Sequence, residues 1–396
     1  MSDGGIALVM RSLDGGGMQR SMLELGRAFT DRGCSVTLLV GDPDGPMRAR
    51  IPAGVDLVPL AAEAPLAARR TVLRLLGREG LPLIGGSMPR MLRHLAALAG
   101  ALQRIRPQAM LARGTQSNLA ALWARQLAGI DTRVVVCECT TLSVASRQSP
   151  RRFRRAYPAL AAHHYPAAEA IVAVSDAVAA DLATTTGLPR AAITAILNGV
   201  TTDIASASGP APDHPWLHDD IPQVLAVGRL HWQKDFATLL RAFAALRRRR
   251  PARLIILGEG PERDYLERLA ETSGVAPDVY FAGFVDNPFV WMARASVLSV
   301  TSLSEGFGNV IVEALACGLP VVSTDCAGGP REILAGDRFG ALVPVGDADA
   351  LADALDRTIA APPDAALLKA RAADFSLAEA SGRYLDLLLG RNLHAA

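Results

Sequence analysis

Short apolar runs alternate with longer amphipathic segments along most of the 396-residue chain. The amphipathic segments 18–30, 236–248 and 262–271 have helical periodicity, with apolar residues recurring every three or four positions. Strands that are continuously apolar and separated by helices are typical of parallel sheets buried on both faces. The pattern therefore predicts an α/β fold throughout. The runs expected to form strands are 6–10, 36–40, 109–112, 134–136, 171–174, 193–197, 224–227, 254–257, 279–281, 297–300, 320–323 and 341–343.

The length predicts two domains, because one hydrophobic core rarely serves a chain of this size. Between residues 198 and 222 the sequence turns to Gly, Ser, Pro, Asp and His, and its four prolines break any regular element. We expect an N-terminal domain over 1–198, a linker over 199–221 and a C-terminal domain over 222–376. Parallel sheets bind ligands beyond the carboxyl ends of their strands, so the site is expected in a cleft between two facing sheets.

Composition excludes some classes of protein and favours one compartment. The formal net charge of +2 lacks the basic excess of a dedicated nucleic-acid binder. The five cysteines are scattered, and Cys137 and Cys139 do not have the spacing of common zinc or redox sites. We expect reduced thiols and a cytoplasmic location. The first residues predict a strand and not a signal peptide, and no apolar stretch reaches the ~18–20 residues of a membrane span, so any membrane contact should be peripheral.

The strongest local signal is S-L-S-E-G-F-G-N-V-I-V-E over residues 302–313. A predicted strand ends, a glycine-punctuated loop follows, and a helix is expected to begin near Asn309. Free N–H groups and the positive helix end suit an anion such as a diphosphate. Glu305 lies in the loop and Glu313 about one turn inside the helix, where one could meet a sugar and the other paired ribose hydroxyls. The alternative is an ordinary capped helix with a solvated glutamate.

Two further segments place residues that could contact a ligand at the ends of predicted strands. Arg229 and Lys234 follow the run 224–227, and both cations can hold phosphate, although surface charges are the simpler alternative for either alone. Gly15, Gly16 and Gly17 follow the first strand and allow close approach to a ligand. A tight turn is the alternative there, because an arginine at position 20 departs from the dinucleotide-binding glycine pattern.

Taken together, these segments resemble the retaining glycosyltransferases of group 1 (family 4). The resemblance implies the GT-B fold, with two facing Rossmann-like domains built on parallel sheets. Residues 325–334 (D-C-A-G-G-P-R-E-I-L) are similar to members that build bacterial surface polysaccharides and lipid-linked oligosaccharides. The segments that carry the resemblance keep their order along most of the chain and are 15–20, 171–178, 197–200, 227–234, 257–263, 281–285 and the Glu305/Glu313 pair.

The resemblance implies a role for each of these positions. Arg229 and Lys234 would hold the donor diphosphate and stabilise its charge during reaction, and Glu305 would lie by the donor sugar. The last helix, within 377–391, would pack back on the N-terminal domain. The remaining donor-binding positions are Gly306, Phe307, Gly308 and Asn309 near sugar and phosphate, Glu313 at the ribose, Phe284 and Val285 at the nucleobase, and Gly16 and Gly17 over the diphosphate.

The implied activity is transfer of a hexose or N-acetylhexosamine from a nucleotide-diphosphate sugar, with UDP expected, to a polyprenyl-diphosphate-linked or other surface glycan. The family's retention of configuration implies attack from the face of the leaving group. No metal or other cofactor is expected. The two D-x-D segments, at Asp42/Asp44 and Asp347/Asp349, fit a turn and a helix start, where Asp is common.

One departure leaves alternatives open. Members of the family commonly carry a histidine where Cys139 stands, and a thiol cannot reproduce the hydrogen bonds of imidazole to a donor sugar. Packing or surface roles are expected for His163 and His164. A non-catalytic protein that binds nucleotide sugars, or an epimerase of the same architecture, therefore remains an alternative, whereas the glycine spacing disfavours an NAD-dependent oxidoreductase.

Two arginine-rich segments suggest contact with a membrane surface. Arg151-Arg152-Phe153-Arg154-Arg155 could place cations at anionic headgroups while Phe153 inserts. Residues 66–95 add arginines among leucine, methionine and isoleucine. Such a surface would suit a lipid-linked acceptor, and a solvated helix face is the alternative.

Overall fold

A computed structural model of the chain describes residues 4–85, 88–147, 151–200 and 214–391. The chain divides into two compact units. Unit 1 comprises Met1–Gly199 with Leu377–Ala396, and unit 2 comprises Val200–Ser376. Most of the linker expected at 199–221 falls at 201–213, outside the described residues.

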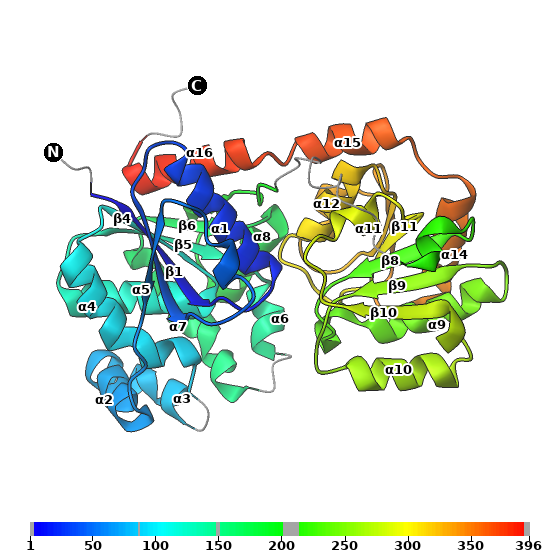
Figure 1. Ribbon diagram of the computed structural model, residues 1–396. Coiled ribbons are helices and arrows are strands. Elements are labelled where there is room, and N and C mark those ends of the chain that lie inside the picture. The colour runs from blue at the N-terminus through cyan, green and yellow to red at the C-terminus, as the bar shows by residue number, and fades with distance from the viewer. Residues whose placement is uncertain (1–3, 86–87, 148–150, 201–213, 392–396) are drawn as a thin grey trace. The chain divides into compact units, whose positions relative to one another are not determined.

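Unit 1 is built on a parallel sheet of seven strands in the order β3-β2-β1-β4-β5-β6-β7. Its central strands pair through apolar residues such as Leu8, Leu38 and Leu111, whose side chains are fully buried. Helices cover both faces of the sheet (Figure 1), so these strands need no polar face. The strands are β1 (Ile6–Ser12), β2 (Val36–Asp42), β3 (Val55–Pro59), β4 (Ala109–Arg113), β5 (Arg133–Glu138), β6 (Ala170–Ala173) and β7 (Ile193–Ala195).

The helices of unit 1 begin and end where local chemistry dictates. Ser175 caps one helix by accepting a hydrogen bond from the amide of Val178, and Gly129 ends another in the left-handed conformation. The helices are α1 (Gly17–Thr30), α2 (Pro65–Leu76), α3 (Leu81–Ile84), α4 (Leu95–Ile105), α5 (Thr115–Ala128), α6 (Leu142–Arg147), α7 (Tyr157–His164), α8 (Asp176–Thr186) and α16 (Leu377–Leu389), and the 3-10 turns used below are η2 (Gly77–Gly80) and η4 (Arg152–Ala156).

Unit 2 has a parallel sheet of six strands in the order β10-β9-β8-β11-β12-β13. Val224, Leu254 and Val297 form its core with the apolar faces of the helices that follow β8 and β13. The strands are β8 (Gln223–Val227), β9 (Arg253–Leu257), β10 (Val279–Gly283), β11 (Val297–Val300), β12 (Val321–Thr324) and β13 (Ala341–Val343). The helices are α9 (Phe236–Arg247), α10 (Arg263–Thr272), α11 (Phe289–Met292), α12 (Asn309–Cys317), α13 (Pro330–Ile333), α14 (Ala348–Ala360) and α15 (Ala365–Ala373).

The predicted α/β fold with parallel sheets is confirmed, and each expected strand is present within a few residues. The apolar pattern did not reveal β3. Among the described residues this strand pairs only with β2, and Asp56 and Pro59 interrupt its apolar residues. An edge strand tolerates both, because one side of its backbone needs no ladder partner.

The last helix, α16, belongs to unit 1 and packs on α1, β4 and β5. Arg32 donates hydrogen bonds to the hydroxyl of Ser381 and the carbonyl of Ala378, both at 2.8 Å. The hydroxyl of Tyr384 lies 3.2 Å from the sulfur of Cys137 in β5. Within the described part of the chain, none of the helices has the length and apolar character needed to cross a membrane.

Candidate functional site

The order of the strands in unit 2 brings two loops together. β8 and β11 are neighbours, with β9 and β10 beyond the first and β12 and β13 beyond the second. Such a reversal of strand order leaves a crevice at the carboxyl ends, where open α/β sheets bind ligands. Arg229 and Lys234 follow β8, and Glu305 follows β11.

Lys234 and Glu305 are in direct contact at this edge of the sheet. The Lys234 ammonium lies 2.5 Å from Oε1 of Glu305, and the Ser302 hydroxyl donates a hydrogen bond of 2.6 Å to the same oxygen. The Glu305 side chain is 11% exposed and that of Lys234 is 25% exposed. Only a small part of the pair is therefore exposed to bulk water. Because the two charges are in contact and partly buried, they attract each other more strongly than they would in water.

Hydrogen bonds to main-chain carbonyl groups join the two loops. The amide of Leu303 donates to the carbonyl of Gln233 at 2.8 Å, and the side-chain amide of Gln233 donates to the carbonyl of Ser304 at 2.9 Å. The Thr301 hydroxyl donates to the carbonyl of Lys234 at 2.8 Å. The position of Lys234 relative to the Glu305 loop is thus set by the main chain.

A third loop, which follows β12, contacts the backbone of Glu305. The amide of Glu305 donates to the carbonyl of Ala327 at 3.0 Å. Gly328 has φ 129°, and a Cβ there would lie 1.6 Å from the carbonyl oxygen of Glu305. A Cβ on Gly329 would lie 2.3 Å from the carbonyl oxygen of Phe307. Only glycine permits this approach of the two backbones.

The helix that follows the Glu305 loop begins as expected. Gly308 precedes it in the left-handed conformation with φ 103°, and Asn309 is its first residue. Gly306 and Phe307 are buried beside them. Glu313 lies one turn inside α12 and is 7% exposed, so the alternative of an ordinary solvated glutamate does not describe it.

Arg229 differs from its neighbours, because its side chain is exposed at the end of β8. Among the residues that the structure describes, Arg229 has no ion pair or hydrogen bond. Its guanidinium is therefore available to an anion at this edge of the sheet.

The negative charge of Glu305 affects the pKa of the nearby Cys326 thiol. Burial, with the negative charge of Glu305 acting in the same direction, raises the pKa of Cys326 to about 12. Cys326 therefore remains a neutral thiol, and Glu305 and Lys234 are the ionisable side chains that meet here.

The remaining predicted positions lie at other strand ends. Phe284 follows β10 at the same edge of unit 2 and is 50% exposed, and Val285 is half-buried. In unit 1, Gly16 caps α1 and Gly17 is its first residue, and both are exposed. The free N–H groups at the start of α1 follow β1, next to β4 at the strand reversal of unit 1.

A buried polar cluster lies at the ends of β4 and β5 in unit 1. Arg113 donates to the Ser21 hydroxyl at 2.8 Å and to Oδ1 of Asn198 at 2.5 Å. Burial opposes ionisation of Cys137, but a hydrogen bond with Cys139 and the charge of Arg113 lower its pKa to about 6. The buried Arg113 guanidinium thus favours the ionised form of the Cys137 thiol.

Cys139, at the position where a histidine was expected, belongs to this cluster. Its sulfur lies 3.9 Å from that of Cys137, and its side chain is half-buried. The hydrogen bond with Cys137 and burial raise its pKa well above the usual range. Cys139 is thus a neutral partner of the Cys137 sulfur.

The neighbouring carboxyl group of Glu138 is buried with neutral partners. Tyr165 donates a short hydrogen bond to Oε1, Asn118 donates to the same oxygen at 3.2 Å, and Thr115 donates to Oε2 at 3.1 Å. Burial outweighs these hydrogen bonds and raises the pKa of Glu138 to about 7. The carboxyl group therefore titrates near neutral pH.

The prediction that Phe153 inserts into a membrane is wrong. Its side chain is 3% exposed in η4 and packs against Tyr157, with ring centroids 5.8 Å apart. In this short 3-10 turn Arg152 and Arg155 are exposed and Arg154 is half-buried, while the single aromatic ring points inward, which the run of charges concealed. In the two D-x-D segments, Asp347 caps α14 and Asp44 pairs with Arg48.

The sequence did not reveal the residues that position Lys234 and Glu305. Ser302 stands three residues before Glu305, and Gly328 and Gly329 lie in a segment noted only for its resemblance. One usable signal was composition. The chain has just two lysines, Lys234 and Lys369, in a sequence otherwise rich in arginine, so a lysine at a strand end is conspicuous.

Known families and proteins match the chain over most of its length. Residues 15–204 match the model described as Glycosyltransferase Family 4, and residues 221–361 match the model described as Glycosyl transferases group 1. The N-acetylgalactosamine-N,N'-diacetylbacillosaminyl-diphospho-undecaprenol 4-alpha-N-acetylgalactosaminyltransferase of Campylobacter jejuni is 34% identical over 233 residues, 58% of this chain and 60% of that protein. The lipopolysaccharide core biosynthesis glycosyltransferase LpsE of Rhizobium meliloti is 39% identical over 141 residues, 36% and 40% of the two chains. The matched stretches thus span less than two thirds of these relatives' own length.

Solved structures share the whole arrangement of strands and helices. Anabaena Alr3699/HepE, in complex with UDP and glucose, superposes with a TM-score of 0.78 at 19% identity, over 98% of this chain and all of that chain. The sucrose-phosphate synthase of Thermosynechococcus elongatus superposes with a TM-score of 0.78 at 23% identity, also over 98% and 100%. At these identities the likeness establishes the fold alone.

Proposed function

Because the chain belongs to the group 1, family 4 glycosyltransferases and has their GT-B fold, we propose that it is an active glycosyltransferase. It transfers a hexose or N-acetylhexosamine from a nucleotide-diphosphate sugar, with UDP as the expected nucleotide, to a glycan or lipid-linked acceptor. The observation that carries this proposal is the contact of Lys234 with Glu305 beside the exposed Arg229, at the strand reversal of unit 2.

The proposed chemistry follows from the charges at this edge. Breaking the bond between the sugar's anomeric carbon and the diphosphate leaves negative charge on a phosphate oxygen. Arg229, Lys234 and the positive N-terminal end of α12 would stabilise that charge most where it develops. These groups can do so without a metal ion. Glu305, whose carboxylate is fixed by Ser302 and Lys234, would face the donor sugar.

We propose that the reaction retains configuration. The acceptor oxygen forms its bond to the anomeric carbon on the face that the diphosphate leaves, and the acceptor's proton passes to a phosphate oxygen. The name of the Campylobacter relative records an α linkage, which supports an α-configured product. Glu313 would bind the ribose and the exposed Phe284 would border the base, with Gly16 and Gly17 contributed by unit 1.

The acceptor is proposed to be a lipid-linked or surface glycan. The Campylobacter relative is named for a diphospho-undecaprenol substrate, and LpsE is named for lipopolysaccharide core biosynthesis. The donor is less restricted among relatives, because a mannosyltransferase of Mycolicibacterium smegmatis, 34% identical over 196 residues, is named as GDP-mannose-dependent. The test must therefore include GDP sugars.

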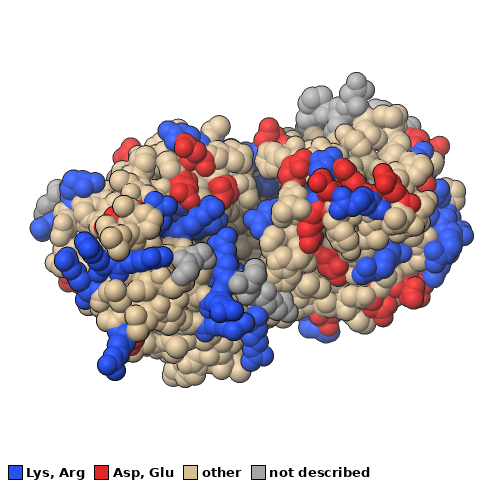
Figure 2. Space-filling view, turned by 90° about the horizontal axis from the view of Figure 1, so that it is seen from below, with Lys and Arg blue, Asp and Glu red and all other residues tan. Residues whose placement is uncertain are grey.

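A surface of unit 1 suits contact with an anionic membrane. On α2, Ala68 and Val72 are buried, whereas Leu66 and Leu73 are 60% and 37% exposed and alternate with the exposed Arg70 and Arg74. Basic side chains gather on this face of unit 1 and acidic ones are sparse (Figure 2). Apolar side chains flanked by arginines are the arrangement of a helix that lies at a headgroup surface.

The activity is tested by incubating the purified chain with UDP and GDP sugars and following nucleotide release with and without a lipid-diphosphate acceptor extract. Acceptor-dependent release that is lost in Glu305→Ala and Lys234→Ala, but kept in Lys369→Ala, is expected. Release that survives a chelator would support metal independence, and NMR of the product gives the configuration. Interconversion of the sugar without acceptor would indicate an epimerase, and donor binding without turnover would indicate a non-catalytic protein.

Membrane contact is tested separately by co-sedimentation with vesicles. The chain should sediment with vesicles containing anionic phospholipid and not with neutral ones, and Arg70→Glu with Arg74→Glu should abolish sedimentation. Arg248→Glu, an exposed change in unit 2, serves as the control. Equal sedimentation of the α2 variant and the control would contradict a specific α2 surface.

A further inference from the structure

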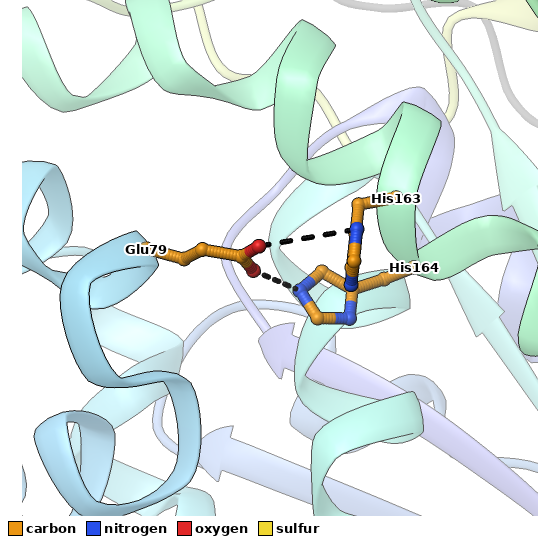
Figure 3. Close-up of side chains that lie close together, drawn as sticks. All are labelled: Glu79, His163 and His164. Carbon is orange, nitrogen blue, oxygen red and sulfur yellow. Dashed lines mark ion pairs between the residues drawn. The ribbon is translucent and has the colours of Figure 1, made fainter.

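Three potential metal ligands from two separate segments of unit 1 meet at its surface. Glu79 comes from η2, and His163 and His164 are the last two residues of α7. One ligand atom from each residue lies within 4.8 Å of the others, and Figure 3 shows both imidazole rings turned toward the Glu79 carboxylate. None of the three belongs to the candidate donor site.

The polar atoms of this cluster lie close together but form no hydrogen bonds with one another. Nε2 of His164 lies 3.3 Å from Oε2 of Glu79, yet this nitrogen is buried and its geometry satisfies no hydrogen bond. Nδ1 of His163 lies 3.9 Å from Oε1 of Glu79, beyond hydrogen-bond distance. The Glu79 carboxylate and one nitrogen of each imidazole therefore converge without a hydrogen bond between them.

The His164 ring is held in place by its packing. It lies edge-on to the buried ring of Trp123 with centroids 5.3 Å apart, and its side chain is 15% exposed. The rings of His163 and His164 meet at a centroid distance of 4.7 Å. Because Glu79 and His163 are exposed, their side chains can shift by the small distance that a metal bond of ~2.0–2.2 Å requires.

The surroundings of the cluster favour a cation. The carboxylate of Glu79 faces a ring nitrogen of both histidines. The carboxyl end of α7, where both histidines lie, also favours positive charge.

We propose that Glu79, His163 and His164 form a binding site for a divalent transition-metal ion, Zn²⁺ above all, with water completing the coordination. Two imidazoles and one carboxylate suit zinc and its transition-metal neighbours, whereas Mg²⁺ and Ca²⁺ prefer oxygen ligands. The ion would join η2 to α7, two segments far apart in the sequence. It stabilises unit 1 and takes no part in the proposed sugar transfer.

The test uses the full chain without a histidine tag, stripped with a chelator and titrated with ZnCl₂ near neutral pH by calorimetry. One Zn²⁺ per chain is expected, and His164→Ala and Glu79→Gln should each weaken binding by at least about 10-fold. The control Glu271→Gln removes an exposed carboxylate elsewhere and should bind like the unchanged chain. Zinc should raise the unfolding temperature of the unchanged chain more than that of Glu79→Gln.

Cysteine thiols could bind the same metal ions. The absorption spectrum of bound Co²⁺ distinguishes a thiolate site from the proposed one. Bound at the proposed site, Co²⁺ should show no thiolate charge-transfer absorption, and Cys139→Ser should leave its binding unchanged. The proposal is overturned if the unchanged chain binds no zinc, or if Glu79→Gln and His164→Ala bind it as tightly as the control. Circular dichroism shows whether each variant is folded. If His164→Ala does not fold, the surface change Glu79→Gln still tests the proposal.

Discussion

The ammonium nitrogen of Lys234 lies 2.5 Å from Oε1 of Glu305, although 71 positions separate the two residues in the chain. The contact exists because β8 and β11 are neighbours in the sheet of unit 2. A diphosphate entering this edge would compete with Glu305 for the Lys234 ammonium. The pair is therefore the first place to test the proposed function.

Lys234→Arg should lower kcat by about 10²- to 10³-fold, because a planar guanidinium cannot occupy the position of the compact ammonium between Glu305 and the leaving group. Lys369→Arg, the same change at the other lysine of the chain, should leave kcat unchanged. Steady-state rates with saturating donor measure both. Equal rates for the two variants would exclude a direct role for Lys234.

Gly328→Ala should disable transfer, because its Cβ would lie 1.6 Å from the carbonyl oxygen of Glu305 and displace that loop. The change should also cost on the order of 1–3 kcal/mol in the free energy of unfolding, since φ is 129°.

Gly336→Ala is the matched control, because Gly336 also has positive φ but its Cβ would meet nothing within 4 Å. It should lose a similar amount of backbone stability and keep its activity. Denaturant unfolding and transfer rates separate the two effects, and an active Gly328→Ala variant would show that the loop tolerates the displacement.

The buried Glu138 should make unit 1 less stable as pH rises. Its folded pKa of about 7 lies above the ordinary value of 4.5, so the folded state holds the proton more tightly than the unfolded state. The stabilisation is complete below about pH 4.5 and is lost as pH rises to about 7, a change of about 3 kcal/mol. Urea unfolding at about pH 5 and about pH 8, compared between the unchanged chain and Glu138→Gln, measures this contribution.

Glu138→Gln should remove this part of the pH dependence, because a glutamine of the same shape accepts from Tyr165 and Asn118 without titrating. Between about pH 5 and about pH 8 the variant should therefore lose about 3 kcal/mol less unfolding free energy than the unchanged chain, because the opposite effect of Cys137 is present in both. An unchanged difference would mean that other groups cause it.

Tyr384→Phe should loosen the attachment of α16 to unit 1 by about 1 kcal/mol, because it removes the hydroxyl that lies 3.2 Å from the Cys137 sulfur. Hydrogen exchange of the α16 amides should increase. Tyr265→Phe, a change at a half-exposed tyrosine of unit 2, is the control and should leave exchange in α16 unaffected. Similar exchange in both variants would show that the Tyr384 hydroxyl does not help to hold α16, leaving apolar packing and the hydrogen bonds of Arg32.

The sequence by itself determined the α/β class, nearly all the strands and the positions of Arg229, Lys234 and Glu305 at strand ends. Parallel strands buried on both faces leave continuous apolar runs, and glycine-rich loops mark where the strands end. Both signals are local, so a single sequence displays them.

Only the tertiary structure decided which of these positions meet. The contact of Gly328 with Glu305, the hydrogen bond between Tyr384 and Cys137 over 247 positions, and the convergence of Glu79 on His163 and His164 all join distant parts of the chain. The burial of Phe153 and the edge strand β3 depend on neighbours in the same way. Local patterns record which face of an element is apolar, whereas contacts between elements depend on strand order and close packing, which no short stretch of sequence contains.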